Sequence, residues 1–90
     1  MTGLLISDTP QLKDVPFDIF SVQHILRTKA VELVELSDAV MYIMEHGKED
    51  GKTRNDLASL IAHREIYGPA LIAGYCGDDV PQAYVDAYMV

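Results

Sequence analysis

The chain has 90 residues, and its 14 acidic and 7 basic side chains give a formal net charge of −7. Because an acidic surface repels the phosphates that a nucleic-acid binder must neutralise, direct binding to DNA or RNA is not expected. A chain of this length forms one domain with a thin core, and its 49% hydrophobic content indicates apolar surface reserved for a second chain. We therefore expect a single domain over residues 1–90 that binds another protein, with a homodimer as the expected assembly.

Residues 1–20 are expected to form an extended arm. They include Pro10 and Pro16, and a proline disfavours helix at the residue before it. Short apolar runs occupy residues 4–6 and 17–20, and a short strand at either run is an alternative. The second run is too apolar to extend freely into solvent, so the end of the arm is predicted to lie on the helices of its own subunit or of a neighbour.

A long amphipathic helix is predicted over residues 21–46, with Ser21 as its N-cap and Gly47 as its C-terminal stop. At 100° per residue, one apolar stripe comprises Val22, Leu26, Leu33, Leu36, Val40 and Met44. With its flanking residues the apolar arc covers about half of the helix circumference, which is more than a single packing partner covers.

The flank that a partner helix would leave open carries Val34 and Met41, which are the first candidates for partner binding. Tyr84 and Tyr88 come next, because methionine and aromatic side chains are enriched at protein interfaces. The alternative is that all four residues fill the core of the monomer.

Residues 47–53 are predicted to form a solvent-exposed loop, since they include two glycines, four charged residues and no apolar residue. The run resembles a phosphate-binding loop, but three residues rather than four separate its first glycine from the Gly-Lys-Thr sequence. It also follows a predicted helix instead of a strand, and Glu49 and Asp50 would repel phosphate. A connecting loop is therefore the preferred interpretation.

A second helix is predicted over residues 54–75, with Thr53 as its cap and a kink or a restart at Pro69. A turn at 74–79 precedes a short C-terminal helix over residues 80–89. The predicted fold class is all-α: a helical hairpin with a kinked or broken second helix, a short C-terminal helix and an extended N-terminal arm.

No catalytic, cofactor-binding or metal-binding residues are predicted. The three histidines lack the spacing of a zinc site, and Cys76 has acidic neighbours that would raise the pKa of a thiol. Lys29 and Arg64 project into the predicted apolar stripes, where they would either extend to water or grip an anionic metabolite between the helices. A small helical enzyme or ligand binder built on these two residues is the alternative function.

The location predicted for the chain is the cytoplasm. Cys76 is its only cysteine, and the first residues lack the basic start and long apolar run of a signal peptide. No apolar stretch approaches the roughly 20 residues that a membrane span requires, so no membrane association is expected.

The sequence Phe20-Ser-Val, followed by a long apolar-faced helix, a charged glycine-containing loop and a second helix, resembles small two-helix proteins of pseudomonads. The design is similar to that of the quorum-sensing antiactivator QslA, which binds a transcription regulator and blocks its dimerisation. This resemblance implies a regulator that binds a partner protein through an apolar helical face, and it assigns no binding residue.

Overall fold

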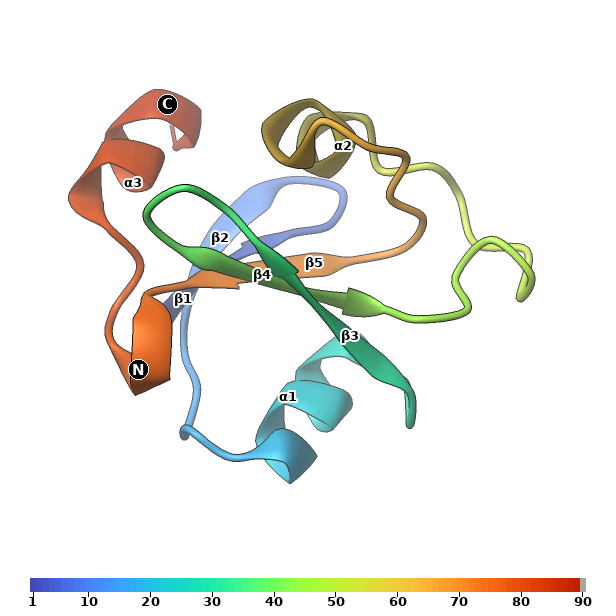
Figure 1. Ribbon diagram of the computed structural model, residues 1–90, viewed down its shortest axis with the longest axis horizontal. Helices are drawn as coiled ribbons and strands as arrows, with labels where there is room; N and C mark the ends of the chain where they lie inside the picture. The colour runs from blue at the N-terminus through green and yellow to red at the C-terminus, as the bar shows by residue number, and fades with distance from the viewer. Residues whose placement is uncertain (90) are drawn as a thin grey trace.

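The structure is a computed structural model, and it describes residues 1–89. Strands and short helices alternate along the described chain (Figure 1). In chain order the elements are β1 (Thr2–Ile6), β2 (Pro10–Asp14), α1 (Ile19–Leu26), β3 (Val31–Glu35), β4 (Val40–Met44), α2 (Asp56–Ala62), β5 (Ala70–Ala73), the 3₁₀ turn η1 (Tyr75–Gly77) and α3 (Gln82–Tyr88).

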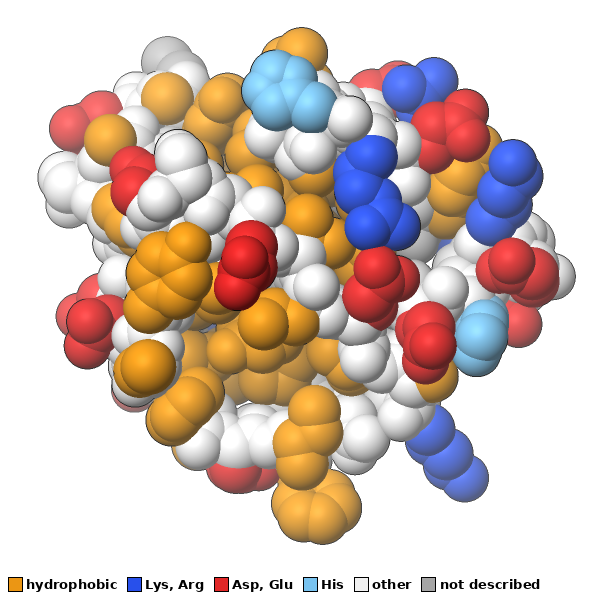
Figure 2. Space-filling view, viewed as in Figure 1, with side chains coloured by type: hydrophobic (Ala, Val, Ile, Leu, Met, Phe, Trp, Pro, Cys, Tyr) orange, Lys and Arg blue, Asp and Glu red, His pale blue; other side chains and the backbone are white. Residues whose placement is uncertain are grey.

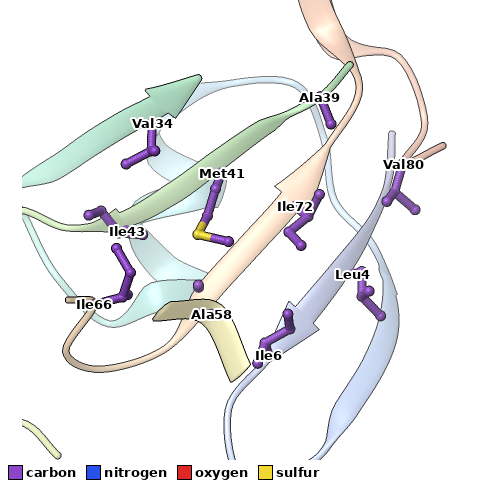
Figure 3. Packing of buried hydrophobic residues seen from close by; sticks show 11 residues of the cluster. Leu4, Ile6, Val34, Ala39, Met41, Ile43, Ala58, Ile66, Ile72 and Val80 are labelled. Carbon is purple, nitrogen blue, oxygen red and sulfur yellow. The ribbon is translucent and has the colours of Figure 1, made fainter. Parts of the chain in front are cut away.

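The strands form one antiparallel sheet in the order β2-β1-β5-β4-β3. Two hairpins, β1–β2 and β3–β4, make the two halves, and β5 joins them by pairing with β1 on one side and β4 on the other. Ile72 of β5 is therefore paired with both Leu4 and Met41, and it lies between them in the core (Figure 3). β5, the last strand in the chain, is therefore the central strand of the sheet.

Each face of the sheet has its own apolar cluster, because successive side chains of a strand point to opposite faces. α2 and α3 lie over one face, and α1 lies over the other (Figure 1). The larger cluster, under α2 and α3, includes Leu4, Ile6, Met41, Ile43, Ala58 and Ile72 (Figure 3). The smaller cluster, under α1, comprises Leu5, Val15, Val22, Leu26 and Leu71.

The predicted all-α helical hairpin is wrong. One helix was predicted over residues 21–46. In the structure α1 ends at Leu26, and the β3–β4 hairpin follows it. α1 is capped by Asp18 rather than Ser21, and its C-cap is Arg27, which adopts a left-handed conformation (φ 56°). The hairpin turns through a two-residue loop, in which the Leu36 N–H donates to the Ala39 carbonyl at 2.9 Å. β-Branched residues, which favour strands, are frequent here: Val31, Val34, Val40 and Ile43.

The predicted second helix over residues 54–75 is also wrong, because only Asp56–Ala62 is helical. Asn55 rather than Thr53 is its N-cap, and His63 (φ 56°) ends it. The chain then turns through Gly68 (φ 88°) and Pro69 into β5. The apolar residues that continue the predicted stripe consequently lie in a strand, with Leu71 and Ile72 in the clusters of opposite faces.

The two ends of the chain also differ in part from the prediction. The arm over residues 1–20 is not simply extended, since it contains the β1–β2 hairpin and the start of α1. The alternative of a strand at residues 4–6 agrees with β1, which lies inside the sheet. A helix forms near the C-terminus, where α3 spans seven of the predicted residues. Among residues 1–89 no helix has the length and apolarity needed to cross a bilayer.

Candidate functional site

The four predicted partner-binding residues lie in or beside the larger core cluster. Val34 and Met41 are directly opposite each other in the β3–β4 register, and both are buried, Met41 completely. Tyr84 and Tyr88 lie on α3, partly buried against the same cluster, with their ring centroids 6.4 Å apart. The structure thus brings the four into one cluster, and their role in partner binding stays a prediction.

Tyr84 also links α3 to the tip of the β3–β4 hairpin. Its hydroxyl donates to Asp38 Oδ1 at 2.6 Å. Burial, followed by this hydrogen bond to a carboxylate, raises the pKa of Tyr84 to about 12. The contact fastens α3 over the core.

Lys29 and Arg64, proposed from the sequence to grip an anion, have separate surroundings. Arg64 Nη1 lies 3.0 Å from Glu32 Oε2, so a carboxylate already neutralises its charge. Arg64 lines a pocket of about 190 Å³ together with Glu32, Lys48 and Tyr67, and Lys29 does not line it. Lys29 is exposed in the loop between α1 and β3. The helix pair that was expected to hold both residues does not form, and the structure records no contact between them.

Exposed apolar side chains gather instead on the α1 side of the sheet. Phe17 is 60% exposed, Ile19 50% and Leu33 52%. Between them Val22 and Tyr42 form the floor of a concave surface, and a pocket of about 210 Å³ lies against Phe17, Asp18, Ile19, Val22 and Tyr42. We call the surface made by Phe17, Ile19, Val22, Leu33 and Tyr42 the α1-side hollow. Figure 2 shows hydrophobic side chains around a depression between α1, η1 and the β3–β4 hairpin.

The floor of the hollow is set by the register of β3 and β4. Leu33 is paired with Tyr42, and their side chains share the α1 face of the sheet. Burial, and to a smaller extent the nearby Cys76 thiol, raises the pKa of Tyr42. Tyr42 therefore presents a half-buried ring in the floor, with an apolar neighbour at the edge of the sheet.

The walls of the hollow are fixed by local contacts. Asp18 accepts hydrogen bonds from the Ser21 N–H at 2.8 Å and the Ser21 hydroxyl at 2.9 Å, which orient the first turn of α1. These bonds lower the pKa of Asp18, whose carboxylate lies beside the pocket. The Phe17 ring packs on η1 at Gly77, where a Cβ would lie 2.7 Å from ring atoms. Only glycine fits under this ring.

A further contact joins η1 to the hairpin. The Tyr75 hydroxyl donates to the Leu36 carbonyl at 2.8 Å. This bond connects the end of β3 to the turn that follows β5, at the side of the hollow away from α1. The concave surface is therefore bounded by three segments held to one another, rather than by freely moving loops.

β3 is an edge strand, and its unpaired edge borders the hollow. The bonds from Leu36 N to Ala39 O and from Glu45 N to Ala30 O, both 2.9 Å, fix which residues face β4. In the antiparallel alternation, residues 32 and 34 exchange bonds with β4, so the N–H and C=O groups of Val31, Leu33 and Glu35 point away from the sheet. The side chains of these three residues are on the α1 face. Backbone donors, backbone acceptors and apolar surface thus lie side by side.

The charged side chains of β3 itself are acidic, while Lys29 precedes the strand and Arg64 pairs with Glu32. β3 contains Glu32 and Glu35 and no basic residue, and the pocket in the hollow is lined by Asp18 as its one charged residue. Glu32 points to the other face, where Arg64 neutralises it. Glu35 is exposed and shares the α1 face with Leu33. Asp18 therefore lies at the pocket in the hollow, and Glu35 lies at the end of β3, where it also lines a separate pocket with Ile61 and Tyr84.

Sequence reasoning did not predict this surface. The apolar run at 17–20 was expected to lie on helices, whereas Phe20 is 77% exposed and Phe17 lies against η1. Leu33 was assigned to a buried helical stripe. The available signal was the frequency of β-branched residues, Val31, Val34, Val40 and Ile43, because such residues favour strands.

The described residues 1–89 contain no cluster of three or more His, Cys, Asp or Glu side chains placed to hold a metal ion. Comparison with known protein families, with curated proteins and with solved structures finds no match to this chain. The resemblance to two-helix proteins gains no support from these comparisons, and residues 20–72 do not form two packed helices.

Proposed function

We propose that the chain is a small protein-interaction module that binds a partner protein at the α1-side hollow. The observation that carries this proposal is the grouping of Phe17, Ile19 and Leu33, each at least half exposed, around the floor made by Tyr42. Contiguous exposed apolar surface rimmed by polar groups is typical of interaction sites, and aromatic side chains are enriched at their centres.

The proposal extends to a regulatory role in which the module covers a functional surface of its partner. The proposed partner class is a transcription regulator, and the proposed location is the cytoplasm. The binding surface differs from the one expected from the sequence, because it is formed by a sheet face, a strand edge and the start of α1 instead of an apolar helical face.

A paired substitution tests the proposal. In the variant Ile19→Asp with Leu33→Asp, two carboxylates replace half-exposed apolar side chains in the hollow, so partner binding should be lost while the fold is retained. Leu60→Asp is the matched control, since Leu60 is 67% exposed on α2 at the opposite face. Affinity capture with each form as bait, followed by reconstitution with the purified captured protein, measures the effect. Equal binding by both variants would exclude the hollow as the binding surface.

The earlier candidates are unsuitable for this test. Asp in place of Val34 or Met41 would place a charge in the core and unfold the protein, so loss of binding would carry no information. Homodimerisation, which the composition suggests, is a separate proposal that sedimentation equilibrium measures directly. A monomer at all concentrations would contradict it without affecting the binding of another protein.

A further inference from the structure

We propose, on the basis of the proposed function, that the partner enters as an extended segment that adds to the free edge of β3 as a sixth, antiparallel strand. The segment carries a basic residue opposite Glu35 and apolar residues opposite Leu33 and Val31. This is recognition by strand addition, in which backbone hydrogen bonds supply affinity and alternate side chains supply specificity.

The backbone of β3 is ready for this pairing. Val31, Leu33 and Glu35 each present an N–H and a C=O to solvent, because their neighbours use the bonds to β4. Every pairing already in the sheet is antiparallel, so an added strand would continue the same ladder. The opposite edge differs, since β2 begins with Pro10 and carries Lys13. Proline and lysine are residues that protect an edge against further pairing.

The side chains then define the sequence of the added strand. Residues directly opposite one another point to the same face, so the partner residues facing Val31, Leu33 and Glu35 extend over the α1-side hollow. Because the added strand runs antiparallel to β3, its sequence from the N- to the C-terminus is a basic residue, any residue, an apolar residue, any residue and an apolar residue. The central apolar residue would lie beside Leu33 and Tyr42, and the basic residue would meet the exposed Glu35.

Charge distinguishes such a segment from a second copy of this chain. Two copies paired edge to edge, with a two-fold axis at Leu33, would place Glu35 of each copy opposite Val31 of the other. That arrangement leaves both carboxylates without a cation, and it brings together two chains of net charge −7. A basic segment instead neutralises Glu35 and approaches Asp18 favourably.

A labelled peptide with the central sequence Arg-Thr-Ile-Thr-Val, titrated by fluorescence anisotropy, is the probe. Leu33→Pro removes the outward N–H and is tolerated on an edge strand, whereas Leu33→Ala keeps that N–H and loses a similar part of the side chain. The proline variant should bind about tenfold more weakly than the alanine variant, because one partner carbonyl is left unpaired. Glu35→Lys should weaken binding of this peptide and strengthen binding of its counterpart with Glu in place of Arg.

Amide exchange followed by NMR gives a second measurement. On peptide binding, the N–H groups of Val31, Leu33 and Glu35 should become protected, while those of the β2 edge should not. Equal affinities of the proline and alanine variants, or binding without this protection, would overturn strand addition and leave the proposed hollow standing. No binding of the peptide to the wild-type protein, or a dimer that protects the Leu33 amide without peptide, would also overturn it. Failure of the proposed function would appear separately, as partner capture unaffected by the paired Asp substitutions.

Discussion

Replacing Asn55 with alanine should destabilise the protein more than any other change at a helix cap. The side chain of Asn55 is buried between three segments. Its Oδ1 accepts from the Ala58 N–H at 3.1 Å and caps α2, while its Nδ2 donates to the Ile6 carbonyl at 2.9 Å and the Gly68 carbonyl at 3.0 Å. One amide thus links the end of β1, the start of α2 and the turn before β5.

The expected loss can be built from these contacts. Losing the cap costs about 1 kcal/mol. The buried Ile6 carbonyl would lose its donor at about 1.5 kcal/mol, and the partly buried Gly68 carbonyl, which water can reach, at about 0.5 kcal/mol. The free energy of unfolding should therefore fall by about 3 kcal/mol, a large part of the 5–15 kcal/mol typical of a domain.

Urea unfolding followed by circular dichroism measures this change. At an m value of about 2 kcal/mol/M the midpoint should fall by about 1.5 M. Asn55→Asp keeps the acceptor for α2 but sets a carboxylate oxygen against the Ile6 and Gly68 carbonyls, so it should be at least as destabilising as Asn55→Ala. Asp18→Ala removes the cap of α1 at an exposed site and serves as the reference. If Asn55→Ala were no more destabilising than Asp18→Ala, the assigned role of the buried amide would be wrong.

Tyr84 should resist ionisation: its pKa is raised to about 12, so the contribution of Tyr84 to stability should be constant below pH 10 and fall between pH 10 and 12, where the unfolded chain releases the proton first. In Tyr84→Phe the decrease in stability between pH 10 and 12 should be smaller, because the contribution of Tyr84 is removed. Urea midpoints measured across this pH range would show the difference, and an unchanged profile would contradict the assignment. Gly47→Ala should destabilise by about 2 kcal/mol or more, because its Cβ would lie 2.2 Å from the Tyr67 carbonyl oxygen. A Cβ at Gly51 meets no atom within 4 Å, so Gly51→Ala should cost only about 1 kcal/mol for its left-handed backbone (φ 76°). Thermal unfolding of both variants tests this comparison, and a lower melting temperature for Gly51→Ala than for Gly47→Ala would refute it.

Part of the architecture was accessible from the sequence. The exposed loop after residue 46 and the helix near the C-terminus depend on local signals, namely charged and glycine residues in one case and Pro81 in the other. A long helix was predicted where strands form, because the chain is apolar at most positions between Val31 and Met44. Such a run fits the period of a helix as well as the period of a strand. The Ser-Asp pair after Leu36 was the local sign of a turn that the helical interpretation passed over.

The candidate site depended on contacts that no local pattern encodes. Asn55 was overlooked because Thr53, two residues earlier, also fits a capping position, and the choice between them is made by distant carbonyls at Ile6 and Gly68. The hollow likewise requires α1 to lie beside β4 and η1 to lie under Phe17. Once β3 was taken as helix, its free edge could not be foreseen, since an edge exists only when the order of the strands is known.

The position of β5 has a consequence for how the chain reaches its fold. Each hairpin can form from neighbouring residues soon after its own synthesis, but neither has a complete face until Ala70–Ala73 arrives between them. During synthesis, which proceeds from the N-terminus, β1 and β4 would therefore wait with unpaired inner edges. Folding should be limited by this late, long-range insertion, and a nascent chain that stops before β5 should be the species most prone to aggregate.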